Sequence, residues 1–405
     1  MPGTEYQPSF LGRIGTRRNQ VMSMEGAHEQ ELEDFELFQR HIGDRFSDLL
    51  SCAIESDTDQ ATSPASDPLL SIAWLRKLVD VFLCCEAEFK AFLIMGRDPS
   101  QIAKPPLDRL ISELLDRSIK LLDICNAVSS GIDNVRQCQR FAEIAVNALR
   151  VTPIGDGQIK RAKKALTSLQ IALTLDEKEC GSGHNKSTER AWSFGKRGNA
   201  HHKGTPTHLG PSLPLRSFSM AIAKNWSASK QIQSMLTNLT APRGAEASGL
   251  ATPVYIISMV MVFTTWALIA AVPCQERSNL PMHFPVSRQV NWAQGMIGLQ
   301  ERIAEEWKKK EKSRTAGLME EMQRLEKVGS GLMEVFGESV RYPMESEKEG
   351  AAMAMVSEMD DICRRMEDGL GPLQHQIREL FHRAVRSRAE MLDLLDGGRL
   401  TQVNN

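Results

Sequence analysis

Apolar side chains recur at steps of three and four residues along most of the chain, which is the period of an α-helix with one buried face. The first such stretch covers residues 25–54, and the second covers residues 68–96. In the second, Asp67 is placed as the N-cap, Pro68 as the first helical residue and Gly96 as the terminator. We therefore predict two helices here, of which the second has the broadest apolar stripe in the chain.

The same period predicts three more helices in the first half of the sequence. Two prolines precede a helix over residues 107–130, which Gly131 is expected to end. A fourth helix then runs to Leu149, and a fifth spans roughly residues 158–175. Five helices joined by short turns indicate an antiparallel bundle, in which the apolar stripes cover one another.

The second half begins with a stretch rich in Gly, Ser, His and Pro, which has little to bury and predicts a linker. Helical periodicity then resumes, with a helix or helix pair at 289–336 and two further helices at 346–368 and 372–395. The fold class we expect is all-α: an antiparallel helical bundle with a flexible central linker and one strongly apolar helix. Its parts are a basic N-terminal tail (1–24), an N-terminal bundle (25–178), the linker (179–216), a helical segment (217–252), the apolar helix (253–273) and a C-terminal helical region (274–405).

The apolar segment is the most informative part of the pattern. It reads VYIISMVMVFTTWALIAAV, from Val254 to Val272, without a charged residue and between two prolines. A helix of this length spans roughly 28 Å, close to the hydrocarbon thickness of a bilayer at about 30 Å. The candidate membrane residues are Val254, Tyr255, Ile256, Ile257, Phe263, Trp266, Leu268, Ile269 and Val272. Three interpretations stay open: a membrane span, a core helix buried in a large bundle, and a peripheral or re-entrant hairpin.

A span would impose a topology on the rest of the chain. More basic residues precede the segment than follow it, so the N-terminal half would be cytoplasmic. The C-terminal region would then be exported, although its amphipathic helices are typical of segments that pack on the N-terminal bundle. We expect a membrane-associated protein, in contact with a lipid bilayer, in the cytosol, at the endoplasmic reticulum or at the plasma membrane, and not a secreted one.

Composition changes this picture little. The net charge of −2 gives no reason to expect nucleic acid as a partner. The eight cysteines are dispersed, without a C-x-x-C pair, which favours a reducing compartment over a disulfide framework. Pro2 occupies the position that a myristoylated glycine would need.

Long stretches of the sequence resemble the BYPASS-like family of plant proteins, in fixed order over most of its length. They are YQPSFLGRIGTRRNQVMSM (Tyr6 to Met24), HEQELEDFELFQRH from His28, LSIAWLRKLVDVFLCCEAEFKA (Leu70 to Ala91), DICNAVSSGIDNVRQCQRFAEIAV (Asp123 to Val146), RSFSMAIAKNWSASKQIQ (Arg216 to Gln233) and WALIAAVPCQER (Trp266 to Arg277). The N-terminus is most similar to the ROH-type branch.

This resemblance implies a non-catalytic adaptor or regulator at membranes. ROH-type members bind a subunit of the exocyst and modulate polarised secretion, so an exocyst subunit is the partner to expect. The alternative is a BYPASS-type regulator of a root-to-shoot mobile signal that controls growth, embedded in a membrane and independent of the exocyst. The family carries no catalytic residues to transfer to this chain.

No residue pattern indicates catalysis, a cofactor or a small-molecule substrate. A histidine group (His184, His201, His202 and His208) lies in the predicted linker and is read as solvated, not as a metal site. The adjacent Cys84 and Cys85 fall on different faces of a helix, which favours packing over redox chemistry. Glu86 and Lys90 have the i, i+4 spacing of a helix surface. Phosphate-binding loops, nucleophile elbows and zinc-protease motifs are missing from the sequence.

Two short stretches are candidates for interaction or regulation. The first combines apolar and basic residues and suits a docking peptide or a contact with anionic lipid: Phe10, Leu11, Arg13, Ile14, Arg17 and Arg18. A tail without fixed structure is the alternative. The second is Ser219, which has a basic residue three positions before it and lies where a helix is expected to begin. It is a candidate phosphosite, or else an unmodified N-cap serine.

Overall fold

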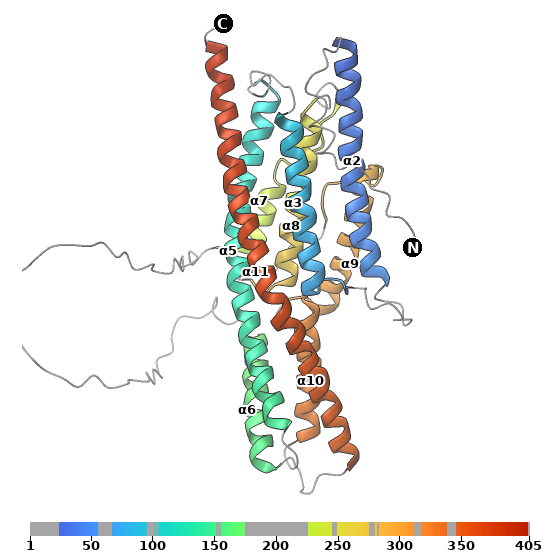
Figure 1. Ribbon diagram of the computed structural model, residues 1–405, viewed down its shortest axis with the longest axis vertical. Helices are drawn as coiled ribbons and strands as arrows, with labels where there is room; N and C mark the ends of the chain where they lie inside the picture. Colours follow the sequence, from blue (N-terminus) through green and yellow to red (C-terminus); the bar gives the residue numbers. More distant parts are fainter. Residues whose placement is uncertain are drawn as a thin grey trace, which may run out of the picture.

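The computed structural model confirms the all-α prediction. It describes residues 24–55, 67–94, 102, 104–150, 155–174, 226–244, 249–274, 280–281, 283–311, 317–337 and 346–403. Within these ranges there are nine α-helices, a short 3₁₀ helix and no strand (Figure 1). The helices are α2 (Met24–Glu55), α3 (Ile72–Ile94), α5 (Leu107–Leu149), α6 (Asp156–Thr174), α7 (Ala228–Leu236), α8 (Ala251–Ala271), η3 (Asn291–Ala293), α9 (Gln294–Glu311), α10 (Glu320–Phe336) and α11 (Ser346–Val403).

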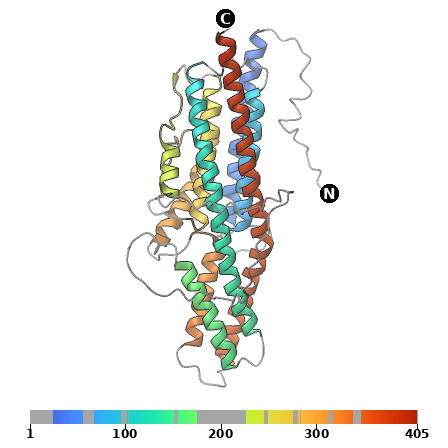
Figure 2. The ribbon, with the colours of Figure 1, turned by 90° about the vertical axis from the view of Figure 1, so that its left-hand side faces the viewer.

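The molecule is an elongated bundle organised on its two longest helices. α5 and α11 run antiparallel and side by side over its length (Figures 1 and 2). At one end they pack with α6 and α10, and at the other with the group that contains α3 and α8. α2 contacts α3 on one side and α9 on the other. Helices from before and after the predicted linker therefore share one hydrophobic core.

The apolar helix α8 lies in the centre of this core. It is long and apolar enough to cross a membrane, and the eighteen-residue window that meets this criterion is entirely buried inside the protein. α3 and α5 pack against it, and Phe46 of α2 meets Phe263 edge to face, with ring centroids 5.4 Å apart. Burying a large apolar side chain contributes about 1.5–3 kcal/mol, so this helix is a principal source of the stability of the bundle.

The last backbone carbonyls of α8 accept hydrogen bonds from another segment of the protein. The last carbonyls of a helix lack partners within the helix. Here the backbone N–H of Leu318 donates to Ala270 O at 2.9 Å, and that of Met319 donates to Ala271 O at 3.1 Å. The segment before α10 therefore caps α8, which ties the chain that follows the apolar helix to its last turn.

Two predicted helix ends were wrong. Gly131 does not end a helix, because α5 continues to Leu149. A Cβ at Gly131 would lie 2.5 Å from Pro273 O. The glycine therefore allows the segment that follows α8 to pass close to α5. Likewise the two helices expected at 346–368 and 372–395 form the single helix α11, with Pro372 inside it. In both cases packing along α5 and α11 prevails over a local terminator signal.

The predicted start of the second helix was also wrong. Asp67 does not cap α3 but forms an ion pair with Lys77 at 2.8 Å. The helix begins at Ile72, and the Ser71 hydroxyl accepts a hydrogen bond from Trp74 N at 3.1 Å, which makes Ser71 the N-cap. The intervening Leu70 has a positive φ of 61°, so a turn separates Pro68 from the helix. One long helix or a helix pair was expected at 289–336, and the structure has the pair, α9 and α10.

Candidate functional site

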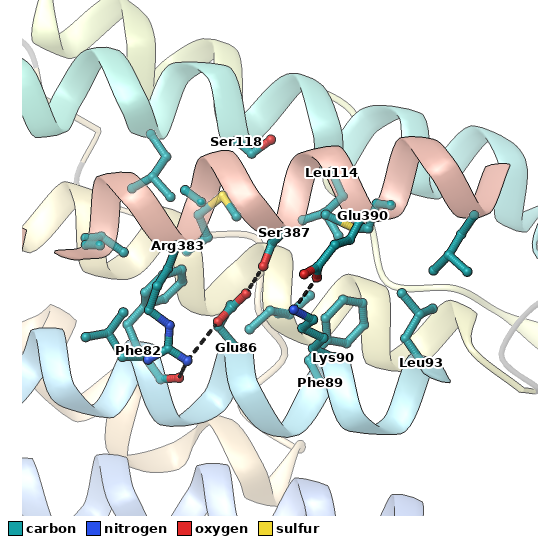
Figure 3. A pocket seen from close by; sticks show the side chains of 18 residues that line it. Phe82, Glu86, Phe89, Lys90, Leu93, Leu114, Ser118, Arg383, Ser387 and Glu390 are labelled. Atoms are coloured by element: carbon teal, nitrogen blue, oxygen red, sulfur yellow. Dashed lines mark hydrogen bonds and ion pairs between the residues drawn. The ribbon is translucent and has the colours of Figure 1, made fainter. Parts of the chain in front are cut away.

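The site is an apolar pocket between α3, α5, α8 and α11, which we call the four-helix pocket (Figure 3). The pocket is small, with a cavity volume of about 50 Å³ beneath its open mouth. The residues that line it include Phe89 and Leu93 of α3, Leu114 of α5, Ile257 of α8 and Met391 of α11.

A group of polar side chains crosses the mouth of this pocket between α3 and α11 (Figure 3). The guanidinium of Arg383 donates to Glu86 Oε2 at 3.2 Å and to the Leu83 carbonyl at 3.3 Å. The hydroxyl of Ser387 donates to the other carboxylate oxygen of Glu86. The ammonium of Lys90 pairs with Glu390 further along the same two helices. The mouth thus carries two cations and two anions, paired across the helices.

The sequence placed Glu86 and Lys90 on a helix surface, and the i, i+4 spacing was interpreted as a local pair. Both residues instead form ion pairs with α11, about 300 positions away along the chain. The signal that could have revealed this is repeated on α11, where Arg383 and Ser387 are also four residues apart. Two helix faces with matching polar spacing can meet across a pocket, although neither sequence pattern identifies its partner.

The candidate membrane residues lie in the core. All nine side chains, from Val254 to Val272, are buried. Tyr255 was expected near a membrane interface. Its hydroxyl instead donates to the Pro285 carbonyl at 3.3 Å, and burial raises the pKa of its phenol. Trp266 packs edge to face on Phe284, with ring centroids 5.2 Å apart.

Only some of the polar side chains of α8 form hydrogen bonds. The hydroxyl of Thr265 donates to the carbonyls of Met261 and Val262 within its own helix, at 2.8 and 2.9 Å. Ser258 Oγ, Thr264 Oγ1 and Trp266 Nε1 have no hydrogen-bond partner among the residues that the structure describes. These buried groups oppose the stability that the apolar residues of α8 provide.

A buried carboxyl joins two helices, α3 and α10, near the end of α8. Glu321, in the first turn of α10, is only 4% exposed, and both of its carboxyl oxygens accept from the backbone N–H of Ile72 at 3.0 and 3.2 Å. Burial raises the pKa of this carboxyl to about 7, and the neighbouring Glu320 adds to the shift. Glu321 therefore links the start of α3 to the start of α10, beside the cap on α8.

The cysteines of the described ranges are free thiols. Cys84 is exposed and Cys85 is buried, as the prediction of different faces requires. Burial raises the pKa of the Cys85 and Cys125 thiols to about 12, far from the range of a reactive thiolate. No group of three or more metal-ligating side chains occurs within the ranges given above.

Several candidates lie outside the described residues. They are the docking residues Phe10, Leu11, Arg13, Ile14, Arg17 and Arg18, the histidines of 179–216, and Ser219. The first described helix after them begins at Ala228, and its N-cap is Ser227. The docking peptide and the phosphosite stay predictions.

The fold and the pocket define a class: a helical-bundle protein with its most apolar helix in the core and a small apolar pocket between four helices. The chain belongs to the ROH1-like family, because the family described as Protein ROH1-like matches residues 1–395. It is 56% identical to Protein ROH1A of Arabidopsis thaliana over 98% of this chain and 97% of that protein. With Protein ROH1D of the same plant the identity is 40%, over 97% and 98%. No solved structure matches the chain.

Proposed function

We propose that this protein is a non-catalytic adaptor that binds a subunit of the exocyst and modulates polarised secretion. The observation that carries the proposal is the family match over residues 1–395, which supports the ROH-type branch. That branch implies the exocyst as partner. Support also comes from the buried thiols, whose raised pKa leaves them poor nucleophiles.

We also propose that the protein acts at a cytosolic membrane surface through its partners, with α8 kept in the core. Helices from both sides of α8 pack on one another: α5 on α11, α3 on α11, and α2 on α9. A single span would place the two sets on opposite sides of the bilayer. The contacts of the bundle therefore favour the core-helix interpretation over the span.

Binding of the full-length protein to purified exocyst subunits tests the adaptor proposal. We expect retention of one subunit by the wild type. A variant with Phe10→Ala, Leu11→Ala and Ile14→Ala should lose that subunit, because these apolar residues belong to the candidate docking peptide. The matched control carries Leu32→Ala, Ile171→Ala and Val385→Ala, three changes at exposed apolar side chains of α2, α6 and α11.

Two results would contradict the proposal. The first is failure of the wild-type chain to retain any subunit. The second is a growth defect that passes through a graft from a loss-of-function root, since only the mobile-signal alternative accounts for a transmissible effect. Retention of the subunit by the triple variant, to the same extent as by its control, would leave the adaptor function intact and exclude the docking peptide as its site.

A further inference from the structure

We propose that the outer face of the α5–α6 hairpin binds directly to the surface of an anionic lipid bilayer. This face, which we call the basic hairpin face, consists of exposed side chains: Arg140 and Ile144 of α5, and Arg161, Lys164 and Ile171 of α6. The inference rests on the proposed location at a membrane surface and adds a direct contact to it. It does not depend on the exocyst as partner.

The two helices bring these side chains to one end of the bundle. α5 and α6 lie side by side there, while α11 packs on α5 and α10 packs on α6 (Figures 1 and 2). Ile144 lies five residues before the end of α5, and Arg161 lies five residues after the start of α6. Because the helices run antiparallel through a short connection, the two positions are level with each other. Arg140 and Lys164 are level to within one residue.

Helix α6 separates its apolar and basic residues onto two faces. Its inner face is buried in the core and includes Ala162, Leu166 and Leu169. Four of its 19 residues are cationic and one is acidic. Since the bundle already covers the apolar face, the helix presents the exposed cations without any rearrangement of the fold.

Three cations of the basic hairpin face have no compensating charge. Arg140, Arg161 and Lys164 form no ion pair with any residue that the structure describes. The acidic groups nearest to them are engaged elsewhere. Asp156 pairs with Lys160 at 2.6 Å. Glu143 is half-buried and accepts from Gln139, whose amide also donates to Glu367 of α11.

The apolar residues of this face favour a bilayer over other polyanions. Ile144 is 40% exposed and Ile171 is 52% exposed, next to cations on the same two helices. Exposed apolar side chains among Lys and Arg are typical of surfaces that lie in the headgroup region, where both kinds of side chain are accommodated. A nucleic acid would pair with the cations but would gain nothing from the isoleucines. With 19 residues α6 is roughly 28 Å long, so it offers an extended surface to the headgroups.

Sedimentation of the full-length protein with vesicles tests the inference. The probes are vesicles of phosphatidylcholine alone, vesicles that also contain phosphatidylserine, and an RNA duplex as a soluble polyanion. We expect binding to the phosphatidylserine vesicles, weaker binding as the salt concentration rises, and little binding to phosphatidylcholine. Exocyst subunits are absent from this assay and lipid is absent from the subunit assay, so either proposal can fail without the other.

Neutralising the three cations locates the contact. The variant with Arg140→Gln, Arg161→Gln and Lys164→Gln should bind phosphatidylserine vesicles about a hundredfold more weakly, because each basic residue near an anionic surface strengthens binding about fivefold. The matched control is Arg109→Gln, Arg378→Gln and Arg386→Gln, which removes three exposed cations of α5 and α11 outside the basic hairpin face. The N-terminal basic residues are unchanged in both variants, so any difference between them reports the hairpin.

A change without loss of charge tests the apolar contribution. Ile144→Ser should weaken vesicle binding about fivefold, since a side chain that is partly exposed in solution leaves water at the bilayer. Val385→Ser is its control, at a side chain of α11 with a similar exposure of 45%. Circular dichroism checks that each variant is folded.

Three results would overturn the proposal. The first is a wild-type protein that does not bind phosphatidylserine vesicles. The second is equal vesicle binding by the hairpin variant and its matched control. The third is binding to the RNA duplex that depends on Arg140, Arg161 and Lys164 while vesicle binding does not, which would assign the face to a nucleic acid.

Discussion

Glu321 shows how much a single buried group can depend on its surroundings. Its carboxyl accepts from the amide of Ile72, which favours the charged form, yet burial and Glu320 have the larger effect and raise its pKa to about 7. In the folded protein it therefore keeps its proton at pH values where an unfolded glutamate, with a pKa of 4.5, has lost it.

The sign of the pH dependence follows from this difference. Between about pH 4.5 and 7 the folded state holds one proton more than the unfolded state at this position, so the contribution of Glu321 to stability falls as pH rises. We expect Glu321→Gln to gain in free energy of unfolding relative to the wild type across this window, by a total on the order of 3 kcal/mol. Denaturant titrations at a series of pH values measure it.

The control for this measurement is Glu347→Gln, at an exposed position in the first turn of α11. Its stability curve should run parallel to that of the wild type. If the curve of Glu321→Gln is also parallel, the carboxyl titrates normally in the folded state and the assigned pKa is wrong.

Residue patterns identified the helices well and their ends poorly. The terminator signals at Gly131 and Pro372 are genuine local preferences, but α5 and α11 bury enough surface on one another to override them. The Asp67-Pro68 start failed for a different reason, because the turn at Leu70 shifts the cap to Ser71. The partners of Glu86 and Lys90 are set by the packing of α3 on α11, which no local pattern contains.

At the scale of elements, two glycines set how closely helices approach. A Cβ on Gly131 of α5 would lie 2.5 Å from Val272 Cγ1 and Pro273 O, and one on Gly295 of α9 would lie 2.5 Å from the backbone of Phe46. Real Cβ atoms do not approach backbone so closely. These positions hold the segment behind α8 against α5, and α9 against α2.

Alanine substitutions should separate this role from helix propensity. Gly131→Ala and Gly295→Ala force neighbouring backbone apart and should lower the free energy of unfolding by about 1–3 kcal/mol. Gly350→Ala in α11 should raise it by about 0.5–1 kcal/mol, because a Cβ there meets nothing within 4 Å and alanine favours the helix. Thermal and denaturant unfolding measure all three. Stabilisation by Gly131→Ala or Gly295→Ala would contradict the close approach.

At the scale of the whole molecule, the apolar helix illustrates what sequence alone leaves open. A run of nineteen uncharged residues fits a bilayer and a bundle core equally well, because both surround it with apolar groups. Its neighbours favour the bundle core, because they come from both halves of the chain: Phe46 before α8, and Leu318 and Met319 after it. The membrane role proposed above would then belong to partners and surface, and not to α8.

The contact between α5 and α11 in cells tests this account most directly. The side-chain amide of Gln139 donates to Glu367 Oε2 at 2.8 Å, and the two residues lie on opposite sides of α8 in sequence. We would introduce Gln139→Cys and Glu367→Cys, with Cys52 and Cys84 replaced by serine and a protease site inserted within residues 179–216. Intact cells are treated with a short, membrane-permeant bismaleimide, and the chain is then cleaved.

A core helix predicts that the two fragments stay joined on a denaturing gel, whereas variants with only one of the two introduced cysteines give separate fragments. Separate fragments from the double variant, with each cysteine labelled by an impermeant reagent from opposite faces of a sealed membrane, would show that α8 spans the bilayer and would contradict the account.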